Sequence, residues 1–208
     1  MNMKKVLAMM LAVVLIVTAT VAGTVAWLTD KTDSVVNTFT ESDVDISLSE
    51  TTGNSYKMVP GATIDKDPVA TVVAGSEACY LFVEISETGG YTVGETTYTF
   101  DDFMTYAIAA GWNLLGGTPG AAIDTAEEDA YVIYRTVSAS DADQPFDVLA
   151  GTVDSGKMVN QITVKDTVTK AMMDGLTSDN YPKLTFTAYA IQQEGFATAA
   201  LAWDEVRN

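Results

Sequence analysis

The chain has 208 residues, 48% of them hydrophobic and 19% charged, which is too apolar for a disordered acidic tail and sufficient for one sizeable core. Its 28 acidic and 11 basic residues give a net charge of −17. We therefore expect no binding of nucleic acid and no polybasic adhesion to an anionic lipid surface. The sequence has no histidine and one cysteine, Cys79, which excludes a Ser-His-Asp triad, a Cys-rich zinc site and an intramolecular disulfide.

The N-terminus has the layout of an export signal. Lys4 and Lys5 form a short cationic head, and residues 6–28 are an uncharged stretch rich in Leu, Val, Ala and Met. Thr24 and Ala26 provide the small residues that a signal peptidase needs, so we predict that residues 1–26 are a signal peptide and that cleavage leaves Trp27 as the new N-terminus. The apolar run is also long enough for a retained transmembrane anchor, which is the alternative.

The first half of the mature chain is expected to form short β-strands. Residues 43–49 alternate apolar and polar side chains, which predicts a strand with one buried face. Residues 69–74 and 78–86 are apolar on both faces, as in the interior of a sandwich. Residues 88–100 contain Gly-rich turns typical of a hairpin.

The second half mixes strands with a few helices. Apolar residues at helical spacing predict a helix over 102–110, and residues 130–137 return to a strand pattern. Thr163–Asp166 has the spacing of a capping box that opens a further helix. Residues 183–191 predict a last strand and residues 195–206 a C-terminal helix. We therefore expect a single mainly-β domain over 27–208, a jelly-roll or Greek-key sandwich with a few short helices.

Several residues invite a chemical role and also have a simpler interpretation. The close carboxylate pairs 43/45, 65/67 and 101/102 could bind Ca²⁺, but none has the spacing of an EF-hand loop. A solvent-exposed strand face or the first turn of a helix explains them equally. We expect no metal and no cofactor. Cys79 is interpreted as a small buried hydrophobe. Trp112 and Trp203 are interpreted as core residues, with a glycan-binding surface as the alternative.

Parts of the sequence resemble the TasA/camelysin family of exported matrix-fibre subunits of Gram-positive bacteria, which a dedicated SipW-type signal peptidase processes. The resemblance covers the signal with an aromatic residue after it, and four later segments: Asn37–Thr40 with Asp43–Leu48, Pro60-Gly61 with Lys66, Val72–Val83, and Lys183–Gln192. Residues 87–180 do not align. Glu41-Ser42 replaces a Gly-containing turn that relatives often have, and Val73 replaces a frequent Asn.

The resemblance implies a jelly-roll subunit that polymerises outside the cell by adding its freed N-terminal segment as a strand to the next copy. Residues 27–36 suit that role because they are β-competent and semi-apolar, with Trp27, Leu28, Val35 and Val36 as the apolar members. The alternatives are a frayed terminus and a first strand of the chain's own domain. Head-to-tail donation is a heterologous contact that need not close, which yields a filament.

These patterns lead to a functional hypothesis without catalysis. We expect a secreted, structural subunit of a fibre or biofilm matrix, whose partners are copies of itself and a SipW-type signal peptidase, and which meets the membrane only through its uncleaved signal. A monomeric surface adhesin or binding module is the first alternative. A camelysin-type metallopeptidase is the second, although a histidine-free chain leaves only carboxylates to hold a metal.

Overall fold

The computed structural model of the chain describes residues 3–5, 10, 43–53, 55–125 and 130–207. The chain divides into two compact units, Met1–Thr40 and Glu41–Asn208. In the first unit, Met3–Lys5 and Met10 are helical. The second unit consists mainly of antiparallel β-strands with a few short helices, which confirms the predicted fold class at that level.

The central sheet of the domain has four antiparallel strands in the order β14-β4-β9-β8. Strand β4 lies between the long strands β14 and β9, and its side chains are largely apolar on both faces, as the interior of a domain requires. The predicted strands at 78–86, 130–137 and 183–191 are thereby confirmed. The bounds are β4 Cys79–Thr88, β8 Asn113–Leu114, β9 Ala130–Val137 and β14 Lys183–Gln192.

Two three-stranded sheets face one side of the central sheet across the core, in the orders β1-β3-β10 and β2-β13-β7. Two hairpins, β5–β6 and β11–β12, complete the strands. The bounds are β1 Ile46–Ser49, β2 Thr63–Ile64, β3 Val69–Val72, β5 Tyr91–Val93, β6 Thr96–Tyr98, β7 Met104–Tyr106, β10 Gln144–Asp147, β11 Thr152–Asp154, β12 Lys157–Val159 and β13 Ile162–Val164.

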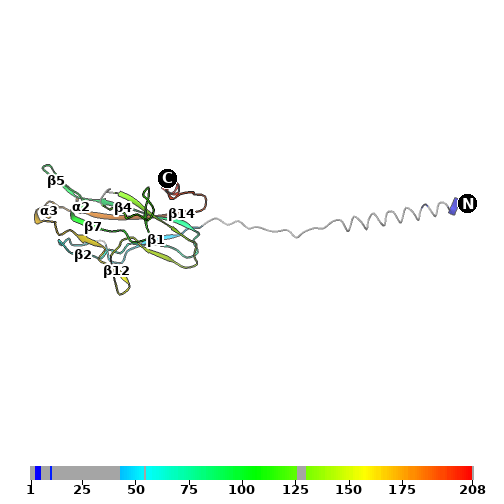
Figure 1. Cartoon of the computed structure of the whole chain (residues 1–208), viewed down its shortest axis with the longest axis horizontal. Coiled ribbons are helices and arrows are strands. Elements are labelled where there is room, and N and C mark those ends of the chain that lie inside the picture. The colour runs from blue at the N-terminus through cyan, green and yellow to red at the C-terminus, as the bar shows by residue number, and fades with distance from the viewer. Residues whose placement is uncertain (1–2, 6–9, 11–42, 54, 126–129, 208) are drawn as a thin grey trace. The chain divides into compact units, whose positions relative to one another are not determined.

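The main core lies between these layers, and a smaller one lies on the opposite face of the central sheet. Cys79, Leu81, Val83 and Ile85 of β4 are fully buried in the main core. On the other face, Phe82 packs against Trp203 of helix α4, Ala199–Val206, with ring centroids 5.3 Å apart. Figure 1 shows the C-terminal helix beside the sheet that contains β4 and β14.

The helix predicted over 102–110 is wrong beyond its first turn. Helix α2 is only Phe100–Phe103, with a capping box between Thr99 and Asp102, and the chain then becomes β7. Met104 and Tyr106 also fit a period of two, and pairing with β13 buries both of them. Tertiary pairing therefore overrides the helical spacing. Figure 1 places β5, α2 and α3 at the same end of the domain.

The capping box predicted at Thr163–Asp166 is also wrong, because Thr163 lies in β13 and pairs with Thr105. The helix that follows, α3 Lys170–Asp174, begins later, and its N-cap is Thr169, whose hydroxyl accepts a hydrogen bond from the Met172 N–H. The predicted C-terminal helix is confirmed but starts at Ala199, with Thr198 as its N-cap.

Strand β1 confirms the alternating segment over 43–49 but starts at Ile46 and is more exposed than predicted. Val44 and Ile46 are half-buried, whereas Leu48 is 37% exposed. Within the described part of the chain, β1 pairs only with β3. It is therefore an edge strand of its sheet.

The main core should dominate the stability of the domain. We expect Leu81→Ala to lower the free energy of unfolding by about 2–5 kcal/mol, because it leaves a cavity at a fully buried site. Leu201→Ala in α4 is the matched control, since the same atoms are removed from a side chain that is 55% exposed, and its effect should stay below about 0.5 kcal/mol. Urea unfolding followed by circular dichroism measures both, and equal losses would contradict this assignment of the core.

Candidate functional site

The most unusual surface feature of the domain is the outer edge of β14. This ten-residue strand pairs with β4 along its whole length, from Lys183 opposite Thr88 to Gln192 opposite Cys79. Among the residues that the structure describes, no strand pairs with its other side. Ten residues of unpaired strand edge form a template for another β-segment.

The register shows which backbone groups point outward. The Gln193 N–H donates to the Ala78 carbonyl at 2.8 Å, so Gln193 and every second residue before it direct their backbone groups toward β4. The residues between them direct their N–H and C=O groups away from β4. These are Leu184, Phe186, Ala188, Ala190 and Gln192.

Strand β1 runs beside β14 and contacts it, yet no hydrogen bond pairs the two strands in the described part of the chain. The Asp43 carbonyl accepts a hydrogen bond from the Glu77 N–H, two residues before β4 begins and near the end of β14. Glu50 directly follows β1, and its carboxylate pairs with Lys66, whose ammonium lies near the Phe186 ring of β14. We call this unpaired boundary the β1–β14 seam.

A groove of about 660 Å³ lies at the beginning of β14. Its floor is apolar, and its lining contains three lysines and no carboxylate. We call it the lysine groove. Its lining includes Lys57, Met58, Ile64, Lys66, Met104, Ile162, Lys183 and Leu184. Lys66 is paired with Glu50, so the lining adds two further positive charges, Lys57 and Lys183, in a chain of net charge −17.

Lys66 is the fixed member of the lysine groove. It is 9% exposed, and its Nζ lies 2.7 Å from both carboxylate oxygens of Glu50. The same Nζ lies 5.6 Å from the centroid of the Phe186 ring. Its backbone N–H donates to Gln161 Oε1 at 3.1 Å. Lys66 therefore connects the end of β1 to β14 through its side chain, and its backbone N–H bonds the side chain of Gln161, just before β13.

Asp67 holds the chain that follows β1. Its carboxylate accepts hydrogen bonds from the backbone N–H groups of Thr51, at 2.8 Å, and Thr52, at 3.0 Å, and from both hydroxyls. Partial burial of the carboxyl raises its pKa, but the hydrogen bonds outweigh burial and lower the pKa to about 2 from an ordinary 3.8. The ionised form of Asp67 thus helps to position Glu50.

The hydrogen bonds of Asp67 should make the free energy of unfolding depend on pH in the acidic range. A lowered folded-state pKa gives stability that is present above the ordinary pKa of 3.8 and is lost as pH falls toward about 2. We expect Asp67→Asn to be less stable than the parent at pH 6 and equal to it near pH 2. Urea midpoints across this range measure the difference; Thr51→Val with Thr52→Val should reproduce the loss. A constant difference at every pH would contradict the assignment.

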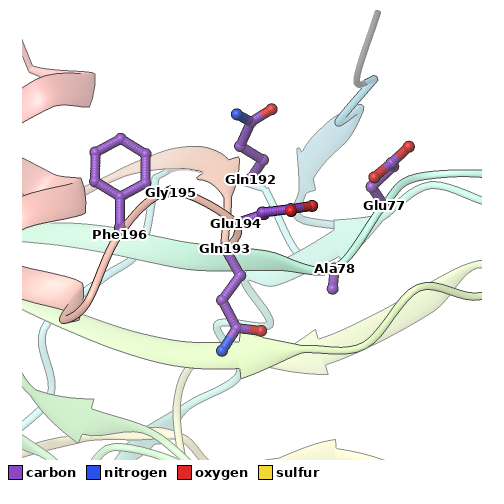
Figure 2. Close-up of a pocket in the computed structure, with 7 residues that line it drawn as sticks. All are labelled: Glu77, Ala78, Gln192, Gln193, Glu194, Gly195 and Phe196. Carbon is purple, nitrogen blue, oxygen red and sulfur yellow. The ribbon is translucent and has the colours of Figure 1, made fainter. Parts of the chain in front are cut away.

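A second hollow, of about 520 Å³, lies at the other end of β14. Glu77 and Glu194 supply two carboxylates to it, Gln192 and Gln193 two amides, and Phe196 an aromatic ring. Figure 2 shows Gln192 and Gln193 pointing to opposite sides of the chain, and Phe196 beside a helix. Among the described residues, none that lines this hollow is basic, and we call it the glutamate hollow.

A buried polar cluster lies elsewhere, where β4, β7 and β9 meet. The Tyr106 hydroxyl donates to Glu87 Oε1 and lies 2.7 Å from the Tyr131 hydroxyl. Burial raises the pKa of both phenols well above their usual range. Phenols that stay protonated at every ordinary pH hold the three strands together and are poor acid–base catalysts near neutrality.

Arg135 is a half-buried polar residue on the core-facing side of β9. Its guanidinium lies 3.7 Å from the Phe146 ring centroid and 5.3 Å from that of Trp112. Trp112 itself is 4% exposed, and its Nε1 donates to the Asp147 carbonyl at 2.8 Å. Trp203 is 6% exposed. Both tryptophans are thus core residues, as predicted, and neither lines a glycan-binding surface.

The remaining predicted candidates have structural roles. Cys79 is fully buried, and burial raises the pKa of its thiol to about 11, so it has no thiolate character near neutral pH. Asp65 accepts a hydrogen bond from the Asn160 N–H, and Asp102 caps α2. Within the described ranges, no three Cys, Asp or Glu residues gather as metal ligands. In the same part of the chain, no helix is long and apolar enough to cross a bilayer.

The predicted processing site and donor segment lie outside the described residues. This applies to the predicted signal, residues 1–26, apart from residues 3–5 and 10, to the cleavage residues Thr24, Ala26 and Trp27, and to the donor residues Leu28, Val35 and Val36. The structure adds what the sequence reasoning missed, namely the open edge of β14 and the two hollows at its ends. A strand pattern over 183–191 signals a strand but not an unpaired edge, which depends on the whole topology.

Comparisons with known proteins give no match: no family model, no curated protein and no solved structure resembles the chain significantly.

Proposed function

We propose that this protein is a secreted structural subunit of an extracellular fibre or biofilm matrix. Cleavage after Ala26 frees residues 27–36, which then add as a strand to the sheet of the next copy. The observation that carries the proposal is the unpaired, ten-residue outer edge of β14. Addition of a strand to such an edge provides affinity through main-chain hydrogen bonds.

The other outer strands are far less suited to accept a strand. β2 and β8 have two residues each, and β7 has three. β10 contains Pro145, which lacks an N–H to donate. Natural proteins protect sheet edges by such shortening and by proline. In the described domain, β14 is the long edge that carries no such protection.

The length of the donor fits the length of the edge. Residues 27–36 number ten, as do the residues of β14. A strand placed here also adjoins β1 across the β1–β14 seam and would join two sheets that are otherwise unpaired. β1 is exposed and short, so it can shift outward to admit the strand. We assign the domain, on this basis and on the resemblance, to a jelly-roll type of sandwich.

The biological setting follows from the same proposal. A SipW-type signal peptidase would cut the leader outside the membrane, and each freed subunit would meet other copies in the extracellular space. Donation from one copy to the next is heterologous and leaves one donor and one edge free at the two ends of every oligomer. Growth can therefore continue into a filament.

A proline substitution on the open edge of β14 tests the proposal. Ala188 directs its N–H outward, so Ala188→Pro removes a donor from the free edge and leaves the pairing with β4 intact. We expect this variant, produced from Trp27 onward, to fold but to form no fibres in electron micrographs. Ala188→Val is the matched control, because it keeps the N–H, and it should assemble.

Two results would contradict the proposal. The first is fibre formation by a folded Ala188→Pro variant at the concentration at which the parent assembles. The second is a parent protein, correctly processed, that stays as single particles under all ionic conditions, as a monomeric binding module would. Circular dichroism of each variant separates a blocked edge from a failure to fold.

Charge should control assembly. Loss of Lys4 and Lys5 with the leader changes the net charge from −17 to −19, so copies repel one another. We expect fibre yield, measured by sedimentation, to rise with salt over about 0.01–0.5 M and to rise as pH falls from neutral to mildly acidic, because both reduce that repulsion. A yield that is flat, or that rises with pH, would contradict this expectation.

A further inference from the structure

The two ends of the open edge carry opposite charge. The lysine groove lies at the start of β14 and has three lysines and no carboxylate in its lining. The glutamate hollow lies at the end of β14 and has two carboxylates and no basic residue. A strand bound along this edge therefore meets a field that differs in sign between its two ends.

We infer that the incoming segment pairs antiparallel to β14, with its newly cleaved amino terminus in the glutamate hollow. This inference rests on the proposed function and specifies its binding site. In full overlap, Trp27 lies opposite Gln192 and Val36 lies opposite Lys183. The acceptor site thus recognises a free α-ammonium group, which exists only after cleavage.

The charges decide between the two possible orientations. A parallel strand would place the α-ammonium of Trp27 near Lys57 and Lys183, where like charges repel it; the charge of Lys66 is already paired with Glu50. The antiparallel strand places the same group beside Glu77 and Glu194. Figure 2 shows the carboxylates of Glu77 and Glu194 on the same side of the hollow. Capture of an amino terminus by a polar hollow is a known mode of peptide recognition.

The antiparallel register also makes suitable cross-strand pairs. Leu28 lies opposite Ile191, an apolar pair on the face that packs against α4. Ser34 lies opposite Thr185, a pair of hydroxyl side chains on an exposed stretch of β14. Pairs of these kinds each stabilise a sheet by a few tenths of a kcal/mol to about 1 kcal/mol.

The lysine groove receives the other end of the segment. Val35 lies opposite Leu184, which forms part of the apolar floor. Asp33 lies opposite Phe186, over whose ring the ammonium of Lys66 is held. The acidic and apolar residues of this half of the segment therefore match the basic rim and the apolar floor of the groove.

The antiparallel orientation prevents a subunit from occupying its own site. The described domain begins at Asp43, whose carbonyl is hydrogen-bonded to the Glu77 N–H at the hollow end of β14. Val36 would have to lie at the opposite end, roughly 30 Å away along ten residues of strand. The seven steps from residue 36 to residue 43 span at most about 25 Å. The donor must therefore come from another copy.

Disulfide trapping between two processed variants tests the orientation. Ser34 and Thr185 form a non-hydrogen-bonded antiparallel pair in this register, whose short Cα separation suits a disulfide. We expect Ser34→Cys protein mixed with Thr185→Cys protein to form a cross-linked dimer on mild oxidation, as read on a non-reducing gel and by mass spectrometry. Thr29→Cys is the matched control, since it would lie opposite residue 185 only in the parallel orientation.

The outcomes separate this inference from the proposed function. At least a tenfold excess of the Ser34–Thr185 product over the Thr29–Thr185 product supports it. The reverse ratio, or neither product in mixtures that form fibres, overturns the antiparallel orientation and leaves the proposed function standing. A parent protein that forms no fibres overturns both. Oxidation of the parent protein alone shows whether the buried native Cys79 forms any cross-link.

Recognition of the new amino terminus has its own test. Both hollow carboxylates are on exposed residues, so Glu77→Gln with Glu194→Gln should fold and should raise the critical concentration for assembly about tenfold or more. Glu95→Gln with Asp166→Asn removes the same charge at distant exposed sites and should lower the critical concentration or leave it unchanged. Equal shifts in the same direction would overturn recognition of the terminus.

Discussion

Unsatisfied backbone hydrogen-bonding groups along β14 are the feature on which this account depends. The strand is fully paired with β4, so every second residue presents its N–H and C=O to the other side. Water can satisfy these groups in the free subunit. In the assembly that we propose, a strand from a second copy would satisfy them with main-chain bonds and bury apolar side chains at the same time, which would favour association once the strand is free.

The contacts around this edge organise it without closing it. Lys66 connects the end of β1 to the ring of Phe186 on β14, and Glu50 and Asp67 hold that region in place. These side-chain contacts keep β1 beside β14 but form no ladder between them. The two sheets thus remain unjoined at the β1–β14 seam, and the ends of the edge keep their opposite charges.

Much of this fold is predictable from local pattern. The strands at 78–86, 130–137 and 183–191 follow from apolar runs and alternation, and all three form the central sheet. The errors occur at 102–110 and 163–166, where helical spacing or a capping pattern coexists with a period of two, and where pairing of β7 with β13 decides the outcome. The open edge of β14 was not predictable, because the absence of a pairing strand among the described residues is a property of the topology. The two charged ends combine residues from distant segments, such as Lys66 with Lys183 and Glu77 with Glu194.

Amide hydrogen exchange on the processed protein, before and after assembly, measures the pairing of the β14 edge residue by residue. We expect the outward-facing amides of β14 to exchange quickly in the free subunit and to become protected in fibres. These amides belong to Leu184, Phe186, Ala188, Ala190 and Gln192, while the alternate amides, already bonded to β4, are protected in both states. Fibres in which the five outward amides still exchange as quickly as in the free subunit would contradict the proposed pairing.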